Sequence, residues 1–166
     1  MVAYHARMAT DAEENPMAPV TKTREHEVGR VTTAAVVENI ADLIRLREGL
    51  IKPGQVRRIE LAETLVDTGA TFLSLPKQYI QKLGLEFQYT RRGITPGGSR
   101  NVRVFSPVRL TVQDRFCMVD VAEVSQKAPV LIGQIPLEIM DFVVEPRAGK
   151  LIPNPAHGGE WTIELL

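Results

Sequence analysis

Residues 61–76, LAETLVDTGATFLSLP, place an acidic side chain between an apolar run and a glycine. The apolar run ends at Val66, and Asp67, Thr68 and Gly69 follow it. A carboxylate after an apolar strand is costly to desolvate, so we expect it to have hydrogen-bond partners, a nearby charge or a chemical role. Gly69 would permit a turn that a Cβ strains and would expose backbone N–H groups toward the carboxylate, and the Thr68 hydroxyl would lock that turn. Asp-Thr-Gly alone is also an ordinary turn, so the surrounding sequence decides its meaning.

The composition of the chain limits the partners that we expect. Its 166 residues suit one domain with a real core and are too few for two of ordinary size. Basic and acidic side chains number 20 each, so we expect neither nucleic acid nor a membrane as a partner. The only cysteine, Cys117, excludes an intrachain disulfide, and we expect it to be buried rather than nucleophilic. No stretch has the length of a membrane span or the apolar core of a secretory signal, which predicts a cytoplasmic protein.

The pattern along the chain separates a tail from a body. Residues 1–27 are polar and without periodicity, so we predict a flexible N-terminal tail followed by a domain over 28–166. Helical spacing predicts short helices at 38–50 and 76–84, and one helical turn at most at 135–140. The remaining segments read as short strands or hairpins: 28–37, 56–66, 90–105, 107–112, 116–124, 128–133, 141–155 and 161–166. Many short strands with few helices predict a mostly β fold, either a small barrel or a folded sheet.

In this context the Asp67 loop resembles the active-site loop of the retropepsin-like aspartic proteases, the single-domain relatives of pepsin. Three further features follow in the order that this family would place them. A glycine-bearing hairpin stands where the family has its flap, formed here by Ile94, Thr95, Pro96, Gly97, Gly98 and Ser99. The apolar segment Leu131, Ile132 and Gly133 resembles the strand that supports the active-site loop. The last residues, WTIELL, resemble the strand that joins two subunits, with Trp161, Ile163 and Leu165 at the dimer interface.

Two sequence segments narrow the resemblance to one branch of the family. LVDTGATFLSLP (65–76) and LEIMDFVVEP (137–146) look like the bacterial branch of these proteases rather than the viral branch. A helix-like insertion over residues 38–55 departs from the minimal viral pattern. The resemblance implies a small closed barrel of the acid-protease type with one or two short helices, which forms a twofold homodimer.

The resemblance also implies an aspartic endopeptidase that cleaves extended or unfolded polypeptide without a cofactor or metal. Such hydrolysis uses two aspartates that share one proton, because two carboxylates so close cannot both ionise. The chain has six aspartates, at 11, 42, 67, 114, 120 and 141, and only Asp67 lies in an Asp-Thr/Ser-Gly tripeptide. We therefore predict that each subunit of a homodimer supplies one Asp67. Ala70 and Thr71 would form the floor beside the pair, and the flap would close over the substrate.

Several features admit other interpretations. The glycine hairpin could be an ordinary exposed loop. The hairpin carries four arginines, Arg91, Arg92, Arg100 and Arg103. They could recruit acidic peptides or bind nucleic acid, although a solvent-exposed charged face is the simpler interpretation. The three histidines, His5, His26 and His157, lack metal-ligand spacing, so we expect no metal site. Trp161 could pack in its own core, and Asp141 could simply form a turn.

Two classes of function therefore remain. The first is the active dimeric endopeptidase. The second is a catalytically weak, protease-like dimer that serves as a peptide-binding or assembly module. The intact Asp67, Thr68 and Gly69 favour the first, because a scaffold has no need to hold two carboxylates together.

Overall fold

The computed structural model describes residues 30–95 and 97–163. Several predictions fall outside these residues and are not addressed by the structure. They concern the tail over 1–27, the domain start at 28, Pro96 in the hairpin, Leu165 at the end of the chain, and two of the histidines, His5 and His26.

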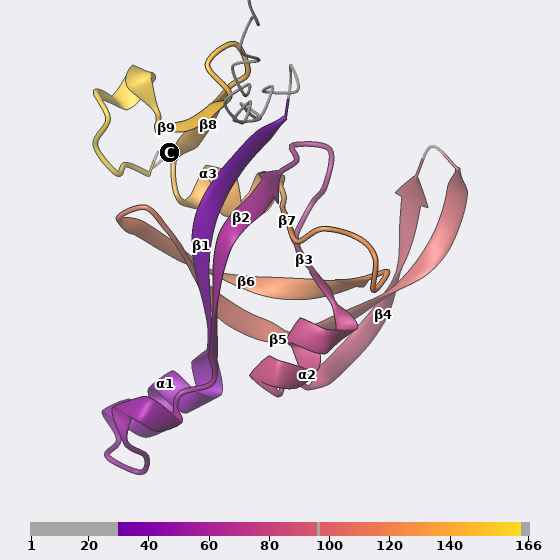
Figure 1. The fold of residues 1–166 in the computed structure, drawn as a ribbon, viewed down its shortest axis with the longest axis vertical. Helices are drawn as coiled ribbons and strands as arrows, with labels where there is room; N and C mark the ends of the chain where they lie inside the picture. Colours follow the sequence, from indigo (N-terminus) through magenta and orange to yellow (C-terminus); the bar gives the residue numbers. More distant parts are fainter. Residues whose placement is uncertain (1–29, 96, 164–166) are drawn as a thin grey trace, which may run out of the picture.

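Strands dominate the described residues, which confirms the prediction of a mostly β fold. Seven of them form one sheet in the order β1-β2-β7-β3-β6-β5-β4. β1 also pairs with β5, so the series of pairings returns to its first strand, and β4 extends from β5 as a hairpin (Figure 1). A separate two-stranded sheet holds β8 and β9. The bounds are β1 Val31–Asn39, β2 Arg58–Val66, β3 Leu73–Pro76, β4 Phe87–Thr95, β5 Gly98–Val112, β6 Arg115–Val124, β7 Leu131–Ile132, β8 Phe142–Glu145 and β9 Lys150–Pro153.

Three short α-helices occur in the described part of the chain: α1 Ile40–Arg47, α2 Lys77–Leu83 and α3 Gln134–Ile139. None of the helices there is long and apolar enough to cross a membrane. The Asn39 side chain caps α1 by accepting a hydrogen bond from the Asp42 N–H. α2 ends at Gly84, whose φ of 59° lies in the left-handed region. α3 is longer than the single turn expected, because Pro136 lies in its first turn, where a missing N–H costs no helical hydrogen bond.

The core is formed by the side chains that point inward from alternate positions along the strands. On β5 and β6 the buried positions face one another, as in the register pair Leu110 and Cys117. Burial raises the pKa of the Cys117 thiol to about 12, so this cysteine is an unreactive apolar side chain, as predicted. β5 is a single strand where two segments were predicted. Its pairing with β6 shifts between Phe105 and Val108, and the intervening Pro107, which has no N–H, fits this irregularity without ending the strand.

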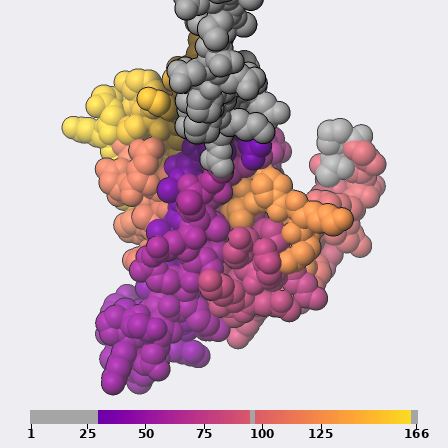
Figure 2. Space-filling model, in the orientation of Figure 1, coloured from indigo at the N-terminus to yellow at the C-terminus, as the bar shows by residue number. Residues whose placement is uncertain are grey.

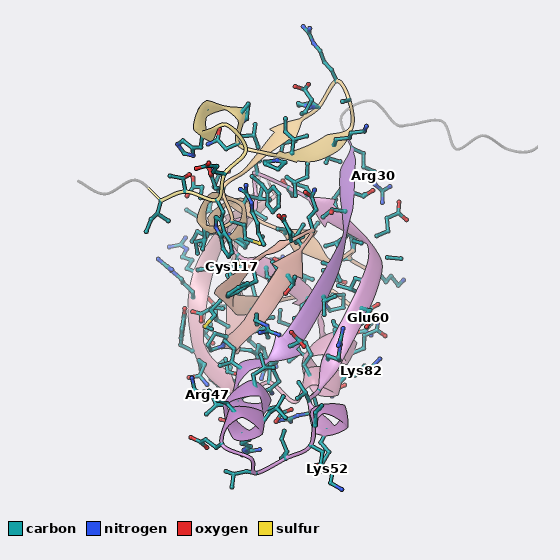
Figure 3. All side chains as sticks on the ribbon, turned by 90° about the vertical axis from the view of Figure 1, so that its left-hand side faces the viewer. Arg30, Arg47, Lys52, Glu60, Lys82 and Cys117 are labelled. Atoms are coloured by element: carbon teal, nitrogen blue, oxygen red, sulfur yellow. The ribbon has the colours of Figure 1, made fainter. Side chains whose placement is uncertain are left out.

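The inserted segment forms an arm at the end of the molecule opposite to Arg30, as the labelled Arg47 and Lys52 show (Figure 3). It contains α1 and one turn of 3-10 helix, Pro53–Gln55. Arg57 holds the arm to the body: its Nε and Nη2 donate to the Asp42 carboxylate at 2.6 and 2.8 Å, and its N–H donates at 3.0 Å. These hydrogen bonds lower the pKa of Asp42, which is only 3% exposed. The arm is therefore a pinned extension rather than a loose loop.

A second carboxylate ties the end of the described chain to the body. Asp141 is buried, with its oxygens 2.8 Å from His157 Nδ1 and 2.8 Å from Asn154 Nδ2. The Thr162 N–H also donates to it. The buried Arg115 guanidinium donates to the carbonyls of residues 140, 141 and 159, which fixes the same segment from the other side. Asp141 is thus more than a turn residue, because it positions the chain that leads to Trp161.

The Asp141 contacts predict a pH-dependent contribution to stability. Its hydrogen bond with His157, followed by that with Asn154, lowers the pKa of Asp141 in the folded protein. A carboxyl group with a depressed folded pKa stabilises the fold above its unfolded pKa of about 3.9, and this stabilisation is lost as the pH falls through the folded pKa. Asp141→Asn should therefore lower the midpoint of thermal unfolding at pH 7, and the difference from the parent should shrink below about pH 4.

Circular dichroism during heating would measure this difference across pH. Asparagine tolerates the left-handed backbone of residue 141, where φ is 54°, so the substitution removes the charge without adding strain. Asp114→Asn, in the exposed turn between β5 and β6, is the matched control and should leave the midpoint nearly unchanged. A deficit in Asp141→Asn that is the same at pH 7 and at about pH 3 would contradict the assignment.

Candidate active site

Asp67 stands at the point where β2 leaves the sheet. β7 runs parallel to β2 with Val66 opposite Ile132, and the Asp67 N–H donates to the Ile132 carbonyl at 3.0 Å. The Ala70 N–H then donates to the Asp67 carbonyl at 3.1 Å and closes the turn. The half-buried Asp67 side chain accepts a hydrogen bond of 2.9 Å from the Gly69 N–H. The loop therefore fixes both the backbone and the carboxylate of Asp67.

Gly69 directs its N–H to the Asp67 carboxylate, as expected, and a Cβ at this position would be crowded. Its backbone is not in the left-handed region, so conformational freedom does not explain the glycine. A Cβ at this position would lie 3.1 Å from Asp67 Oδ1, so glycine is favoured because it lets the backbone approach the carboxylate closely. The expected lock by the Thr68 hydroxyl is not formed among the described residues, where Thr68 is exposed. The backbone bond from Ala70 to Asp67 closes the loop instead.

The segment after β7 supports the far side of the loop. β7 lies between β2 and β3, where Leu131 is opposite both Leu65 and Ser74. Beyond it the Gln134 N–H donates to the Ala70 carbonyl at 2.8 Å, and the Ile135 N–H donates to the Thr71 carbonyl at 3.1 Å. These two donors were not predicted from the sequence, since backbone groups leave no residue-type signal. The glycine before them was the available clue.

Gly133 passes closer to the loop than any side chain would permit. A Cβ added to it would meet the Ala70 and Phe72 carbonyl oxygens at 2.6 Å and the Thr71 carbonyl carbon at 2.7 Å. Its φ of −87° is an ordinary value, so close approach alone accounts for the glycine. The structure thus brings together the loop over 67–71 and the segment over 131–135.

The glycine hairpin forms at the same end of the molecule as the Asp67 loop (Figure 1). β4 and β5 pair antiparallel out to Thr95 and Gly98, and Ile94 pairs with Ser99. Gly98 has a φ of 115°, a value that favours glycine. Ile94 is 88% exposed. Figure 2 shows open space between the upper part of this hairpin and the body, so the hairpin and the loop face each other across a gap.

Asp67 has no carboxylate partner among the described aspartates. Asp42 binds Arg57 in the arm. Asp120 accepts a hydrogen bond of 3.1 Å from the Tyr89 hydroxyl. Asp141 binds His157, and Asp114 lies in the exposed turn after β5. A second aspartate beside Asp67 is therefore not supplied by residues 30–95 or 97–163.

The expected terminal strand is not formed in residues 161–163. A strand needs a neighbour to pair with, and the described residues of this single chain offer none at that place. Trp161 instead donates from Nε1 to the Ile139 carbonyl at 3.1 Å and packs edge-on against Phe116, with ring centroids 5.3 Å apart. Trp161 remains 44% exposed and Ile163 70% exposed, so both retain apolar surface.

The described residues offer no cluster of three or more His, Cys, Asp or Glu side chains that could hold a metal ion. A groove of about 470 Å³ lies on β1, β2 and β5, away from the Asp67 loop. Its lining consists of Ala34, Ala35, Val36, Glu60, Leu61, Ala62, Thr111 and Gln113. The candidate chemistry therefore rests on one carboxylate in a rigid loop, opposite a projecting hairpin.

Comparison with known proteins supports a family for this arrangement. A family model described as aspartyl protease matches residues 53–135, which are 83 of the 166 residues. The match covers β2, the Asp67 loop, the hairpin, β7 and Gly133, and it leaves β1 and the Asp141 contacts outside. No curated protein matches the chain.

Proposed function

The chain belongs to the aspartyl protease family, and from this premise we propose that it is an endopeptidase whose active form is a twofold homodimer. Each subunit would supply one Asp67, and the substrate would be an extended or unfolded polypeptide. The observation that carries the proposal is the isolation of Asp67, which a hydrogen-bonded loop presents without a second aspartate among the described residues. We further propose that the chain is a single-domain, retropepsin-like protease of the bacterial branch. In this proposal the sheet, whose pairings return from β5 to β1, is the small closed barrel of that family.

Two Asp67 side chains on a twofold axis would share one proton, since their like charges cannot both form at short range. The ionised carboxylate would take a proton from a bound water, which attacks the peptide carbonyl carbon. The protonated carboxyl would donate its hydrogen bond to the carbonyl oxygen as negative charge develops there. The Gly69 N–H contact supports this role, because a donor at Oδ1 fixes the orientation of the carboxylate.

The hairpin and the chain end would complete the dimeric site. The hairpin edge suits an extended peptide that pairs as an added strand, and closure of Ile94 would exclude water from the Asp67 pair. The exposed Trp161 and Ile163 lie at the start of the last six residues, where a strand from a second copy could supply the missing neighbour. Dimerisation would then give residues 161–163 a strand to pair with and cover the apolar surface of Trp161 and Ile163.

The number of inhibitor sites tests the shared site. The probe is a peptide mimic with a tetrahedral hydroxyl group in place of the scissile carbonyl, which transition-state complementarity should make a tight ligand. Titration calorimetry should give one bound mimic for every two chains, and analytical ultracentrifugation should show a dimer at the same concentration. One mimic per chain, or saturable binding to a monomer, would refute the shared dyad.

A further inference from the structure

The register of the hairpin separates its arginines onto two faces. Antiparallel partners share a face, and faces alternate along each strand. One face, here called the inner hairpin face, contains three register pairs: Thr90 with Arg103, Arg92 with Asn101, and Ile94 with Ser99. The opposite face, here called the outer hairpin face, contains Arg91 with Val102 and Gly93 with Arg100. Neighbouring arginines on β4 therefore point in opposite directions.

The contacts at the base of the hairpin show which face continues the core. Arg103 lies two residues from the buried Phe105 on β5, and its guanidinium carbon is 5.0 Å from the centre of that ring. The inner hairpin face is thus the extension of the core-facing side of the sheet. On the other face Tyr89 reaches Asp120, which alternates on β6 with the exposed Met118. The outer hairpin face therefore leads to the side of the sheet that carries Asp120 and Met118, where Val104, the register partner of Tyr89, is buried but lies outside the cluster of residues that forms the core.

Only one arginine of the inner hairpin face lacks a carboxylate partner in the described part of the chain. Arg103 Nη1 pairs with Glu123 at 3.1 Å. Arg92 donates from Nη2 to the Ser99 hydroxyl at 3.0 Å, and this neutral partner leaves its positive charge uncompensated. Both side chains of the Arg92–Ser99 pair are exposed, and both lie on the inner hairpin face.

We infer that Arg92 selects polypeptide segments that carry an acidic side chain close to the scissile bond. This inference rests on the proposed function, because the ligand is the peptide held between the hairpin and the Asp67 loop. In a peptide paired with the hairpin as a strand, every second side chain would point to the inner hairpin face. Twofold symmetry would place a second Arg92 on the other side of the bond, so acidic residues would be favoured on both sides.

Closure of the site would make this charge selective. An exposed arginine gains little from a carboxylate, since water and salt screen the pair. Once a peptide fills the gap and excludes water, an arginine-carboxylate hydrogen bond becomes shorter and stronger than one to a neutral amide. Hydrogen bonds to charged groups then correspond to a preference of about tenfold or more for Glu over Gln.

Peptide binding to the Asp67→Asn chain tests the inference without hydrolysis. The probes are fluorescent peptides with a central pair of apolar residues and either Glu or Gln at matched positions, moved outward one position at a time. Fluorescence anisotropy should show that the best Glu peptide binds about tenfold more tightly than its Gln twin at about 50 mM salt. Arg92→Gln should remove this difference, and Arg92→Glu should reverse it.

Arg91→Gln is the matched control, because it removes the same charge from the adjacent residue on the outer hairpin face. It should keep the preference for Glu. Equal binding of the twins, equal loss in the two Gln variants, or no peptide binding at all would overturn the inference. Tighter binding of a single-stranded oligonucleotide of equal charge would overturn it in favour of nucleic acid.

Hydrolysis by the parent chain separates this inference from the proposed function. If the parent cleaves an unfolded protein and the twins bind equally, the proposed function stands and the role of Arg92 fails. If Glu peptides bind better through Arg92 and no substrate is cleaved, the peptide site stands and the endopeptidase fails.

Discussion

Asp67→Asn is expected to reduce hydrolysis of an unfolded protein by at least about a thousandfold, because asparagine cannot ionise or exchange a proton with its partner. The loop should remain intact, since the amide oxygen of the introduced asparagine can still accept the Gly69 N–H bond and the backbone bonds from residues 67 and 70 are unchanged. The loss would therefore be chemical rather than structural. Purified parent and variant would be compared by release of labelled fragments from about pH 4 to about pH 7, where a carboxylate dyad should titrate.

Mixtures of the two chains give a sharper test of whether one site needs two copies. If subunits exchange freely, the fraction of dimers with two Asp67 residues is the square of the parent fraction. An equal mixture should thus retain about one quarter of the activity of the same total concentration of parent chain, whereas a site within one chain would retain about one half. Activity that falls linearly with the parent fraction would exclude the shared dyad.

Control variants must show that the mixed chains are folded dimers. Asp67→Asn should sediment as the parent does, and relief of repulsion between two close carboxylates should make its dimer at least as stable. Asp114→Asn, in the β5–β6 turn, is the control: an equal mixture of this variant with the parent should keep the full activity of the same total concentration of parent chain. Undiminished hydrolysis by Asp67→Asn alone would remove Asp67 from the chemistry altogether.

The sequence predicted most elements because their signals are local. Three local features each mark a place where the chain must turn or an element must end: the Asp-Thr-Gly turn after an apolar strand, the glycine after α2 and the glycine at the hairpin tip. The register between distant strands has no local signal in the sequence. No motif predicts that Leu131 lies between Leu65 and Ser74. Pairing of distant strands depends on the whole fold; the family resemblance suggests that residues 131–133 support the loop, but only the structure shows this register and the hydrogen bonds from Gln134 and Ile135.

The differences between sequence and structure have identifiable physical causes. Backbone freedom does not account for Gly69, because its φ is not in the left-handed region; a Cβ there would instead crowd the Asp67 carboxylate, with Oδ1 at 3.1 Å. The alternation over 161–166 predicts a strand between two subunits; within one chain residues 161–163 form no strand, since alternation creates a strand only where a neighbour exists, and the intersubunit strand stays a prediction. Asp141 does lie in a turn, as the sequence suggests, but its contact with His157 could not be predicted, because the two residues are 16 positions apart and no motif links them.

Gly133→Ala should destabilise the protein more than any other single methyl group added to this loop system. The new Cβ would stand 2.6 Å from two carbonyl oxygens and 2.7 Å from a carbonyl carbon, all of them backbone atoms of residues 70–72. Backbone cannot rotate away as a side chain can, so the strand and the loop must separate. Overpacking of this kind costs about 3 kcal/mol or more, a large part of the total stability of a domain. Urea unfolding would measure the loss.

The same substitution should also abolish activity in chains that still fold. Separation at Gly133 would stretch the backbone hydrogen bonds from the Gln134 N–H to the Ala70 carbonyl and from the Asp67 N–H to the Ile132 carbonyl. These two hydrogen bonds hold both ends of the catalytic loop. A misplacement of about 1 Å at reacting groups lowers rates by about a hundredfold. Gly54→Ala is the matched control, because no atom lies within 4 Å of its added Cβ and it sits in the arm, at the far end of β1. If Gly133→Ala unfolded at the same urea concentration as Gly54→Ala and kept full activity, the segment over 131–135 would not be what holds Asp67 in place.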